Sequence, residues 1–171
     1  MNYRRLFLDG HSCYITMGTY RRRPYLIEYI DLLREAFAKS KERYTYAIDA
    51  VTVLPDHLHM VITPERSEDY PRIVKQIKRS FVYLLPDGIK EKARLSLSYS
   101  LYRRGHSGIR QSRYYEHTIR NEKDWLEKRE YIRNNPVKHD LCEHWEEWKY
   151  SSFTKPCRPG VPAPDICVVH R

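Results

Sequence analysis

The sequence predicts an α+β protein, because short β-prone runs alternate with longer segments whose apolar residues recur at helical spacing. The first β-prone run covers residues 13–19, and a helical pattern follows Pro24 over residues 25–41. Residues 44–54 and 57–63 are both β-prone and are separated by the turn residues Pro55 and Asp56, which predicts an antiparallel pair. A second helix is expected over residues 69–84.

The second half of the chain predicts one more strand, over residues 114–119, and a third helix, over residues 122–134. Between them, residues 85–108 contain Pro86, three glycines and four serines, which favours a loop or a mobile lid over a site. The resulting order, β-α-β-β-α-β-α, is that of a ferredoxin-like sandwich with an antiparallel sheet and an added C-terminal helix.

The length and composition suit one domain with an irregular C-terminal tail. The chain has 171 residues, of which 41% are hydrophobic, enough for a single core. After Asn135, several prolines forbid long regular structure. Aromatic residues still occur there, and we expect them to dock on the domain: Trp145, Trp148, Tyr150 and Phe153. The predicted domain is therefore 1–153, followed by a loosely ordered Pro-rich tail, 154–171.

Two absences in the sequence favour a cytoplasmic protein. No stretch approaches the roughly 18 apolar residues of a membrane span, and the N-terminus lacks the apolar core of a signal peptide. The four cysteines, Cys13, Cys142, Cys157 and Cys167, contain no Cys-x-x-Cys pair and match no zinc-site spacing. We interpret them as reduced thiols.

The charge of the chain favours nucleic acid as its partner. The formal net charge is +9 and the isoelectric point is near 9.4, and a field of this sign attracts polyanions. The basic residues are locally clustered, whereas a solvated surface usually mixes signs. The candidate phosphate contacts are Arg4, Arg5, Arg21, Arg22, Arg23, Lys75, Lys78 and Arg79.

His57 and His59 are the strongest candidates for chemistry. They lie in the predicted strand after Asp56, and alternation along a strand places both on one face, with Leu58 and Met60 on the other. One face could then coordinate a metal while the other packs. The alternative is that the histidines are ordinary polar residues on a sheet surface.

Tyr131 and Asn135 lie four residues apart and therefore share a face of the third helix. Pro136 disfavours the α conformation of Asn135, so we expect the helix to stop there. The side-chain carbonyl of Asn135 could then reach the ion as a third metal ligand. Asn135 could instead be a plain C-terminal cap. Tyr131 is one of 15 tyrosines, most of which must be packing or surface residues.

Together these residues give the chain its resemblance to a known family. His57-Leu58-His59 after Pro55-Asp56, followed by Tyr131-Ile132-Arg133-Asn134-Asn135-Pro136-Val137-Lys138-His139, resembles the REP-associated tyrosine transposases, members of the single-tyrosine HUH superfamily of bacteria. Further matching stretches are residues 20–24, 76–81, 114–120 and 148–153, so the resemblance covers nearly the whole chain.

The resemblance implies a site and an activity. His57 and His59 would be the metal ligands, Asn135 the third ligand and Tyr131 the nucleophile, with Lys138 added to the DNA contacts. The implied substrate is single-stranded DNA beside a hairpin, cleaved and rejoined through a 5′-phosphotyrosine with Mg²⁺ or Mn²⁺ and no nucleotide cofactor. We expect a nucleoid-associated cytoplasmic protein and favour a monomer over a dimer.

Two departures from the family pattern stand out. The family commonly has Trp-Gln before its fourth strand, where this chain has Arg110-Gln111, and it usually has Gly where this chain has Asp140. Two other functions stay open at this point. One is a hairpin-binding protein without catalysis. The other is a metal-dependent phosphodiesterase, or an RNA-binding ferredoxin-like domain, in which the histidines activate water.

Overall fold

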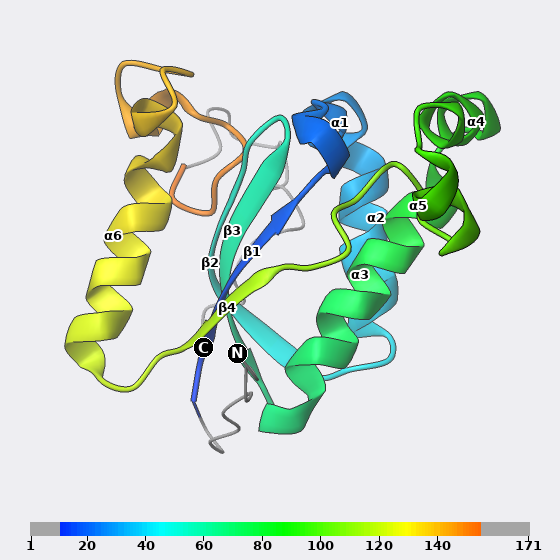
Figure 1. Ribbon diagram of the computed structural model, residues 1–171. Coiled ribbons are helices and arrows are strands. Elements are labelled where there is room, and N and C mark those ends of the chain that lie inside the picture. Colours follow the sequence, from blue (N-terminus) through cyan, green and yellow to red (C-terminus); the bar gives the residue numbers. More distant parts are fainter. Residues whose placement is uncertain (1–10, 155–171) are drawn as a thin grey trace.

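A four-stranded antiparallel sheet forms the centre of the computed structural model, which describes residues 11–154 (Figure 1). The strand order is β2-β3-β1-β4, with all neighbours antiparallel. The strands are β1 (Cys13–Gly18), β2 (Tyr46–Val53), β3 (His57–Pro64) and β4 (Tyr115–Thr118). The predicted fold class and the predicted pairing of β2 with β3 are confirmed.

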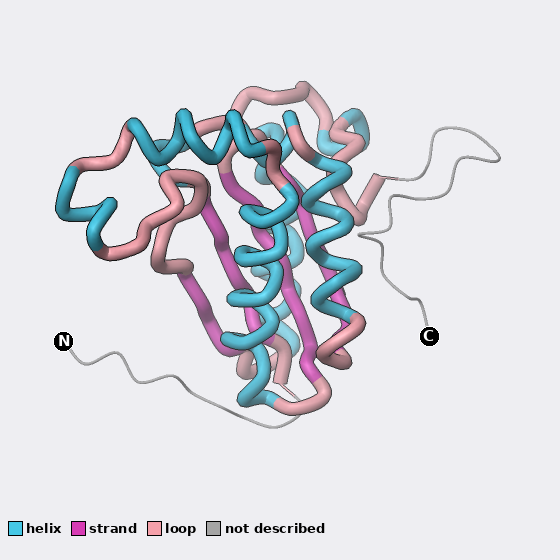
Figure 2. The backbone as a smooth tube through the Cα atoms, turned by 90° about the vertical axis from the view of Figure 1, so that its right-hand side faces the viewer, coloured by secondary structure: helices cyan, strands magenta, loops and turns pink. Residues whose placement is uncertain are grey.

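Helices cover both faces of this sheet (Figures 1 and 2). One face carries α1 (Tyr25–Glu28), α2 (Ile30–Lys41) and α3 (Tyr70–Leu84), and the other carries α6 (Glu122–Lys138). Short 3₁₀ turns complete the described chain: η1 (Tyr20–Arg22), η2 (Ser67–Asp69) and η3 (Trp145–Glu147). The predicted helix over residues 25–41 is in fact kinked at Tyr29, although Tyr29 N still donates to the Tyr25 carbonyl.

The alternation of side chains along the strands divides the interior into two parts. Leu58, Met60 and Ile62 of β3 pack with β1, β2 and the helices α2 and α3, in the larger hydrophobic core. On the other face a smaller cluster joins Tyr14, Ala50 and Val61 to Ile132 of α6. Because this second cluster is small, α6 leaves room beside it for polar side chains at the sheet surface.

The chain after α6 returns to the outer edge of β2. Tyr150 O accepts from Val53 N at 2.9 Å, and Ser152 N donates to Val51 O at 2.9 Å. The Trp148 indole donates to Val53 O at 2.9 Å, and the Ser152 hydroxyl accepts from Val51 N at 3.0 Å. The expectation that this aromatic segment docks on the domain is therefore correct as far as residue 154, and residues 155–171 of the predicted tail lie outside the described residues.

The expected loop at 85–108 is wrong. It contains two helices, α4 (Asp87–Leu95) and α5 (Tyr99–Arg103), which lie beside the end of α3 in Figure 1. Gly88 lies inside α4, where glycine is unfavourable but tolerated. Gly108 does mark a turn: it has φ of +71°, and a Cβ there would approach the Ala93 carbonyl oxygen to 2.4 Å.

The expected end of the third helix at Asn135 is also wrong, because α6 continues through Pro136 to Lys138. Proline removes one donor from a helix but does not prevent the next residues from bonding, and here His139 N donates to Asn135 O at 3.1 Å. The helix begins where expected, with the Asn121 side chain accepting from Asp124 N at 2.9 Å.

Two further observations concern membrane-spanning helices and cysteines. Within residues 11–154, no helix has the length and apolar character that crossing a bilayer requires. Cys13 and Cys142 are free thiols, as predicted, whereas Cys157 and Cys167 lie outside the described residues.

Candidate active site

His57 and His59 project from β3 toward α6, on the face opposite Leu58 and Met60, as the alternation predicts. Each is only 4% exposed, and their ring centroids lie 4.9 Å apart with the rings perpendicular. Two imidazoles this close in a buried place are costly to protonate. Burial lowers the pKa of both, that of His59 to about 3, so both rings are neutral at physiological pH.

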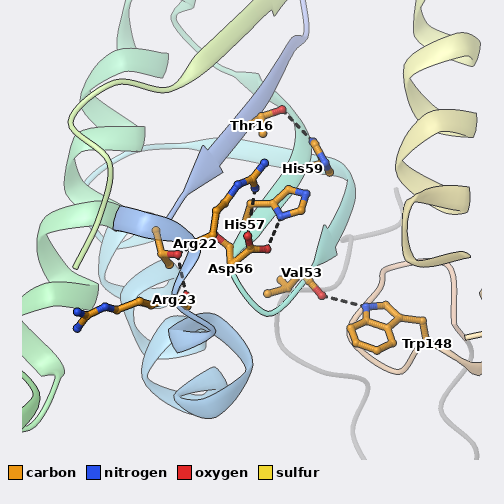
Figure 3. A network of polar contacts seen from close by, with 9 residues as sticks. Thr16, Arg22, Arg23, Val53, Asp56, His57, His59 and Trp148 are labelled. Carbon is orange, nitrogen blue, oxygen red and sulfur yellow. Dashed lines mark hydrogen bonds and ion pairs between the residues drawn. The ribbon is translucent and has the colours of Figure 1, made fainter. Parts of the chain in front are cut away.

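The tautomer of His57 is set by Asp56. The Asp56 carboxylate accepts a hydrogen bond of 2.6 Å from His57 Nδ1, and a carboxylate has no proton to give in return (Figure 3). The lone pair of His57 is therefore on Nε2. Arg22 of η1 forms an ion pair with the same carboxylate at 3.3 Å. Asp56 therefore links the Arg22 cation to the His57 imidazole.

His59 is held from the neighbouring strand β1. Its Nδ1 lies 2.8 Å from the Tyr14 hydroxyl and 2.8 Å from the Thr16 hydroxyl. Its Nε2 is buried and has no hydrogen-bond partner among the described residues. When Nδ1 carries the proton and donates it to one of these hydroxyl oxygens, Nε2 presents a lone pair beside that of His57.

Asn135 of α6 lies beside His59, close enough for its side chain to act on the pKa of that imidazole. It is fully buried, and neither its Oδ1 nor its Nδ2 has a hydrogen-bond partner among the described residues. A buried amide without partners costs free energy, and native structures rarely keep one unless a ligand or water satisfies it. The alternative reading of Asn135 as a plain helix cap is wrong, because α6 continues past it.

Tyr131 lies one turn before Asn135 and stands out by its exposure. The residue is 39% exposed, and the centroid of its ring is only 5.3 Å from that of His59 and 6.3 Å from that of Tyr14. The Lys138 ammonium lies 4.9 Å from the centre of the same ring. A phenol is thus accessible to a large substrate beside a buried pair of imidazoles.

Sequence reasoning missed His139 as part of this site. Its ring centroid lies 5.0 Å from that of His57. Tyr131, Asn135 and His139 follow one another at helical spacing, which was the available signal. A helix that ends at Asn135, as Pro136 predicts, would not carry this spacing on to residue 139.

The site residues fit a divalent cation. Across residues 11–154, no three His, Cys, Asp or Glu side chains are arranged to hold a metal ion, so other oxygen-bearing side chains beside His57 and His59 are the candidates for a third ligand. The Asn135 carbonyl oxygen is such a ligand, and it is buried without a partner. Two imidazole nitrogens and one amide oxygen, with remaining positions open to a substrate, suit Mn²⁺ or Mg²⁺.

The predicted DNA contacts are spread over several elements. Arg21 and Arg22 are exposed in η1, both with a positive φ of 54°, and Lys138 is exposed at the end of α6. Arg23 donates to the Tyr25 hydroxyl at 2.9 Å. Lys75 and Arg79 share an exposed face of α3. Arg4 and Arg5 lie outside the described residues.

Lys78 is not where the helical spacing of the basic residues implied. It is 7% exposed and points toward the segment before β4, where its ammonium donates to Ser112 O at 3.3 Å. Position 78 lies on the core side of α3 with Val74 and Phe81, which explains its burial.

Comparisons with known proteins point in one direction. The sequence pattern of the family described as Transposase IS200 like matches residues 9–135. A protein of Haemophilus influenzae, provisionally named a REP-associated tyrosine transposase, is 35% identical over 162 residues, covering 94% of this chain and 89% of that protein. The REP-associated tyrosine transposase of Escherichia coli K12 is 31% identical over 161 residues, covering 93% of this chain and 86% of that one.

One solved structure agrees with these sequences. A chain described as the REP-associated tyrosine transposase bound to a REP hairpin superposes with a TM-score of 0.71. It is 30% identical, and the alignment covers 90% of this chain and 82% of that chain.

Proposed function

Because the chain belongs to the IS200-like transposases, and within them to the REP-associated tyrosine transposases, we propose that it cleaves and rejoins single-stranded DNA beside hairpin elements through a tyrosine-linked intermediate. The observation that carries this proposal is the position of Tyr131. Its exposed phenol lies beside two buried, neutral imidazoles, and the Nδ1 atom of each imidazole is already within hydrogen-bond distance of another side chain. The hairpin in the related solved structure supports the choice of substrate.

The covalent step balances around one phosphorus atom. Tyr131 Oη forms a bond to the scissile phosphorus and loses its proton, while the bond from that phosphorus to the 3′ oxygen breaks. The 3′ oxygen leaves as a hydroxyl, having gained a proton, and the 5′ phosphate stays on the tyrosine. A second 3′ hydroxyl can reverse the step on another strand, because the linkage to tyrosine keeps a phosphodiester, so no nucleotide cofactor is needed.

The residues of this chain divide the remaining work. His57, His59 and Asn135 would hold Mg²⁺ or Mn²⁺, which when bound supplies electrostatic stabilisation of the phosphate oxygens. Asp56 and the hydroxyls of Tyr14 and Thr16 keep the two imidazoles oriented. Lys138, which is exposed, puts a positive charge beside the nucleophile.

The test is incubation with end-labelled single-stranded hairpin DNA and Mn²⁺, followed by a denaturing gel. Wild type should give a protein-linked DNA fragment, and Tyr131→Phe should give none. Tyr83→Phe is the matched control, because Tyr83 is also an exposed tyrosine but lies on α3, across the sheet from the histidines. His57→Ala should lose the adduct while still binding DNA.

Each other outcome points to a different function. Cleavage without an adduct, in wild type and in Tyr131→Phe alike, would mean that an activated water is the nucleophile. Tight hairpin binding with neither cleavage nor adduct, over several hairpins and both metals, would mean a binding protein without catalysis. Either result would overturn the proposed tyrosine mechanism.

A further inference from the structure

A cluster of positive charges lies outside the candidate active site. It consists of Lys78 and Arg79 on α3 and Arg110 in the segment that leads to β4. Lys78 lies 5.6 Å from the centre of the Tyr114 ring, and Lys78 and Arg110 line the same small cavity of about 30 Å³ beneath α3. The Arg110 Nε atom is buried and has no hydrogen-bond partner among the described residues. We call this group the α3 cationic cluster.

No carboxylate balances these charges in the part of the chain that the structure describes. Arg110 is the charged residue that shifts the pKa of Lys78, and Arg79 is the one that shifts the pKa of Arg110. Both of these charge–charge interactions are repulsive. Burial together with Arg110 lowers the pKa of Lys78 to about 8. The ion pairs found within residues 11–154 involve other cations, Arg22, Arg34, Lys39, Arg72, Lys90 and Arg133.

A buried cation without a counter-ion destabilises a fold, and substitution by an apolar residue usually relieves the cost. A bound anion relieves it as well, by converting repulsion into attraction. The cluster also offers unused donors at its rim, since Arg79 is exposed and Arg110 is only partly buried. These features are those of an anion-binding site rather than of a packing device.

The position of the cluster relates it to the histidines. Tyr20 N donates to Ile109 O at 2.9 Å and Gln111 N to Gly18 O at 3.0 Å, so residues 109–111 continue the sheet beyond the end of β1. Gly18 is the β1 residue paired with His57. The α3 cationic cluster therefore lies at the histidine-bearing end of the sheet, on the α3 side, and the backbone bridge between Thr19 and Arg110 brings the start of η1 beside it.

We propose that the α3 cationic cluster binds a phosphate group of the DNA backbone, at a second contact separate from the phosphate attacked by Tyr131. The DNA would pass over the end of β1, from the histidine side of the sheet to the α3 side. This inference rests on the proposed function for the identity of the anion, whereas the burial and the repulsion within the cluster do not depend on it.

The test compares Arg110→Met with Arg43→Met. Both substitutions remove one positive charge, but Arg43 is exposed and follows α2, at the end of the sheet far from His57. For hairpin DNA, Arg110→Met should raise the Kd about tenfold and reduce the slope of log K against log salt by roughly 0.7 to 0.9, the value of one phosphate contact. Arg43→Met should leave both near wild type, and Arg110→Lys should recover most of the affinity.

A second measurement uses inorganic phosphate alone. Inorganic phosphate at about 10 mM, with the ionic strength held constant by chloride, should raise the Tm of wild type and of Arg43→Met by about 3 °C. The same phosphate should raise the Tm of Arg110→Met by much less. Because Arg110→Met removes an unbalanced charge, it should be at least as stable as wild type without phosphate, so lost binding cannot be ascribed to misfolding.

The two proposals fail separately. Wild-type Kd, salt slope and phosphate response in Arg110→Met would overturn the second phosphate site, whether or not the wild type forms a tyrosine adduct. Loss of DNA affinity in Arg110→Met, in a protein whose wild type never forms an adduct, would support the phosphate site and overturn only the proposed chemistry.

Discussion

At the scale of one residue, Asp140 stands where the family usually has glycine, and this difference costs stability. Its φ of 54° lies in the left-handed region, and it directly follows the last residue of the α6 cap, His139. Leu141 N donates to Pro136 O and Asp140 N to Val137 O, each at 3.0 Å, which is the Schellman arrangement that favours glycine. The family's usual glycine at this position thus has a conformational cause.

Asp140→Gly should therefore stabilise the protein by about 0.5 kcal/mol, since it removes the left-handed strain of roughly 1 kcal/mol and adds some unfolded-state entropy. Urea unfolding measures the difference. Asp140→Ala keeps the strain and should give no such gain. If the glycine variant unfolds at a lower urea concentration than wild type, Asp140 is making an interaction that offsets its backbone cost.

Lys78 should give the folded protein a distinctive dependence on alkaline pH. Its pKa is lowered to about 8 when folded, below the roughly 10.4 of an unfolded lysine, so the unfolded chain binds more protons between these values. Stability must then rise with pH through this window. Measured against Lys78→Met, wild type should gain about 1.5 kcal/mol between pH 8 and pH 9.5. A flat difference would mean that Lys78 titrates normally in the folded state.

Asp56 should act on metal binding through His57. Asp56→Asn keeps the size of the side chain but loses the charge that fixes the His57 tautomer and pairs with Arg22. Mn²⁺ affinity should fall about tenfold, as is usual when such a supporting group is changed. Calorimetric titration of the metal-free protein measures it, with Asp31→Asn as the control, because Asp31 is an exposed aspartate on α2. Equal Mn²⁺ affinities of wild type and Asp56→Asn would show that Asp56 does not support metal binding.

At the scale of elements, α6 is positioned by the segment that follows it as well as by the sheet. Arg133 of α6 lies 5.2 Å from the centre of the Trp145 ring, and Arg129 lies 5.1 Å from that of Phe153. The same segment is tied to β2 through the Trp148 indole. The helix that carries Tyr131 is therefore held between β2 and its own C-terminal continuation.

Trp148→Phe should reveal this dependence. It keeps an aromatic ring and removes the hydrogen bond to Val53 O, at a cost of about 1 kcal/mol in the free energy of unfolding. Trp145→Phe is the matched control, since no hydrogen bond of the Trp145 indole is found within residues 11–154. A smaller loss in Trp148→Phe than in the control would mean that water replaces the indole without cost.

The elements that could be predicted from sequence are those whose pattern repeats over many residues. Alternation fixed the faces of His57 and His59, and helical spacing identified α3 and most of α6. The failures came from single residues used as signals. Pro136 was expected to stop a helix that its neighbours continue, and Gly88 was counted as a loop residue although it lies in α4.

The supporting residues of the site were harder to foresee than its candidate ligands. Tyr14 and Thr16 meet His59 only because β1 pairs with β3 in one register, Thr16 opposite His59. No local pattern encodes that register. The burial of Lys78 was missed for a similar reason, because its partner segment, at residues 110–114, lies more than thirty positions further along the chain.

At the scale of the whole molecule, one chain supplies every residue of the candidate site. His57 and His59 come from β3, and Tyr131 and Asn135 come from the α6 of the same chain. We expect a monomer to be the working unit. The alternative is an exchange of α6 between two chains.

Mixing two inactive variants distinguishes these cases. His59→Ala and Tyr131→Phe should each fail to form a DNA adduct, and an equimolar mixture should fail as well, because neither chain has a complete site. Recovery of about a quarter of the wild-type adduct in the mixture would show that tyrosine helices are exchanged, because half of the dimers would be mixed and each would have one complete site of two. Each variant mixed with wild type controls for simple interference.

The return of residues 148–152 to β2 also bears on how the protein behaves at high concentration. An exposed strand edge can recruit strands from other copies and so begin aggregation. Here the outward N–H and C=O groups of Val51 and Val53 are all bonded within the chain, and the opposite edge strand, β4, is only four residues long. The protein thus covers part of one edge of its sheet and keeps the strand at the other edge short, which reduces the backbone on which a growing fibril could form.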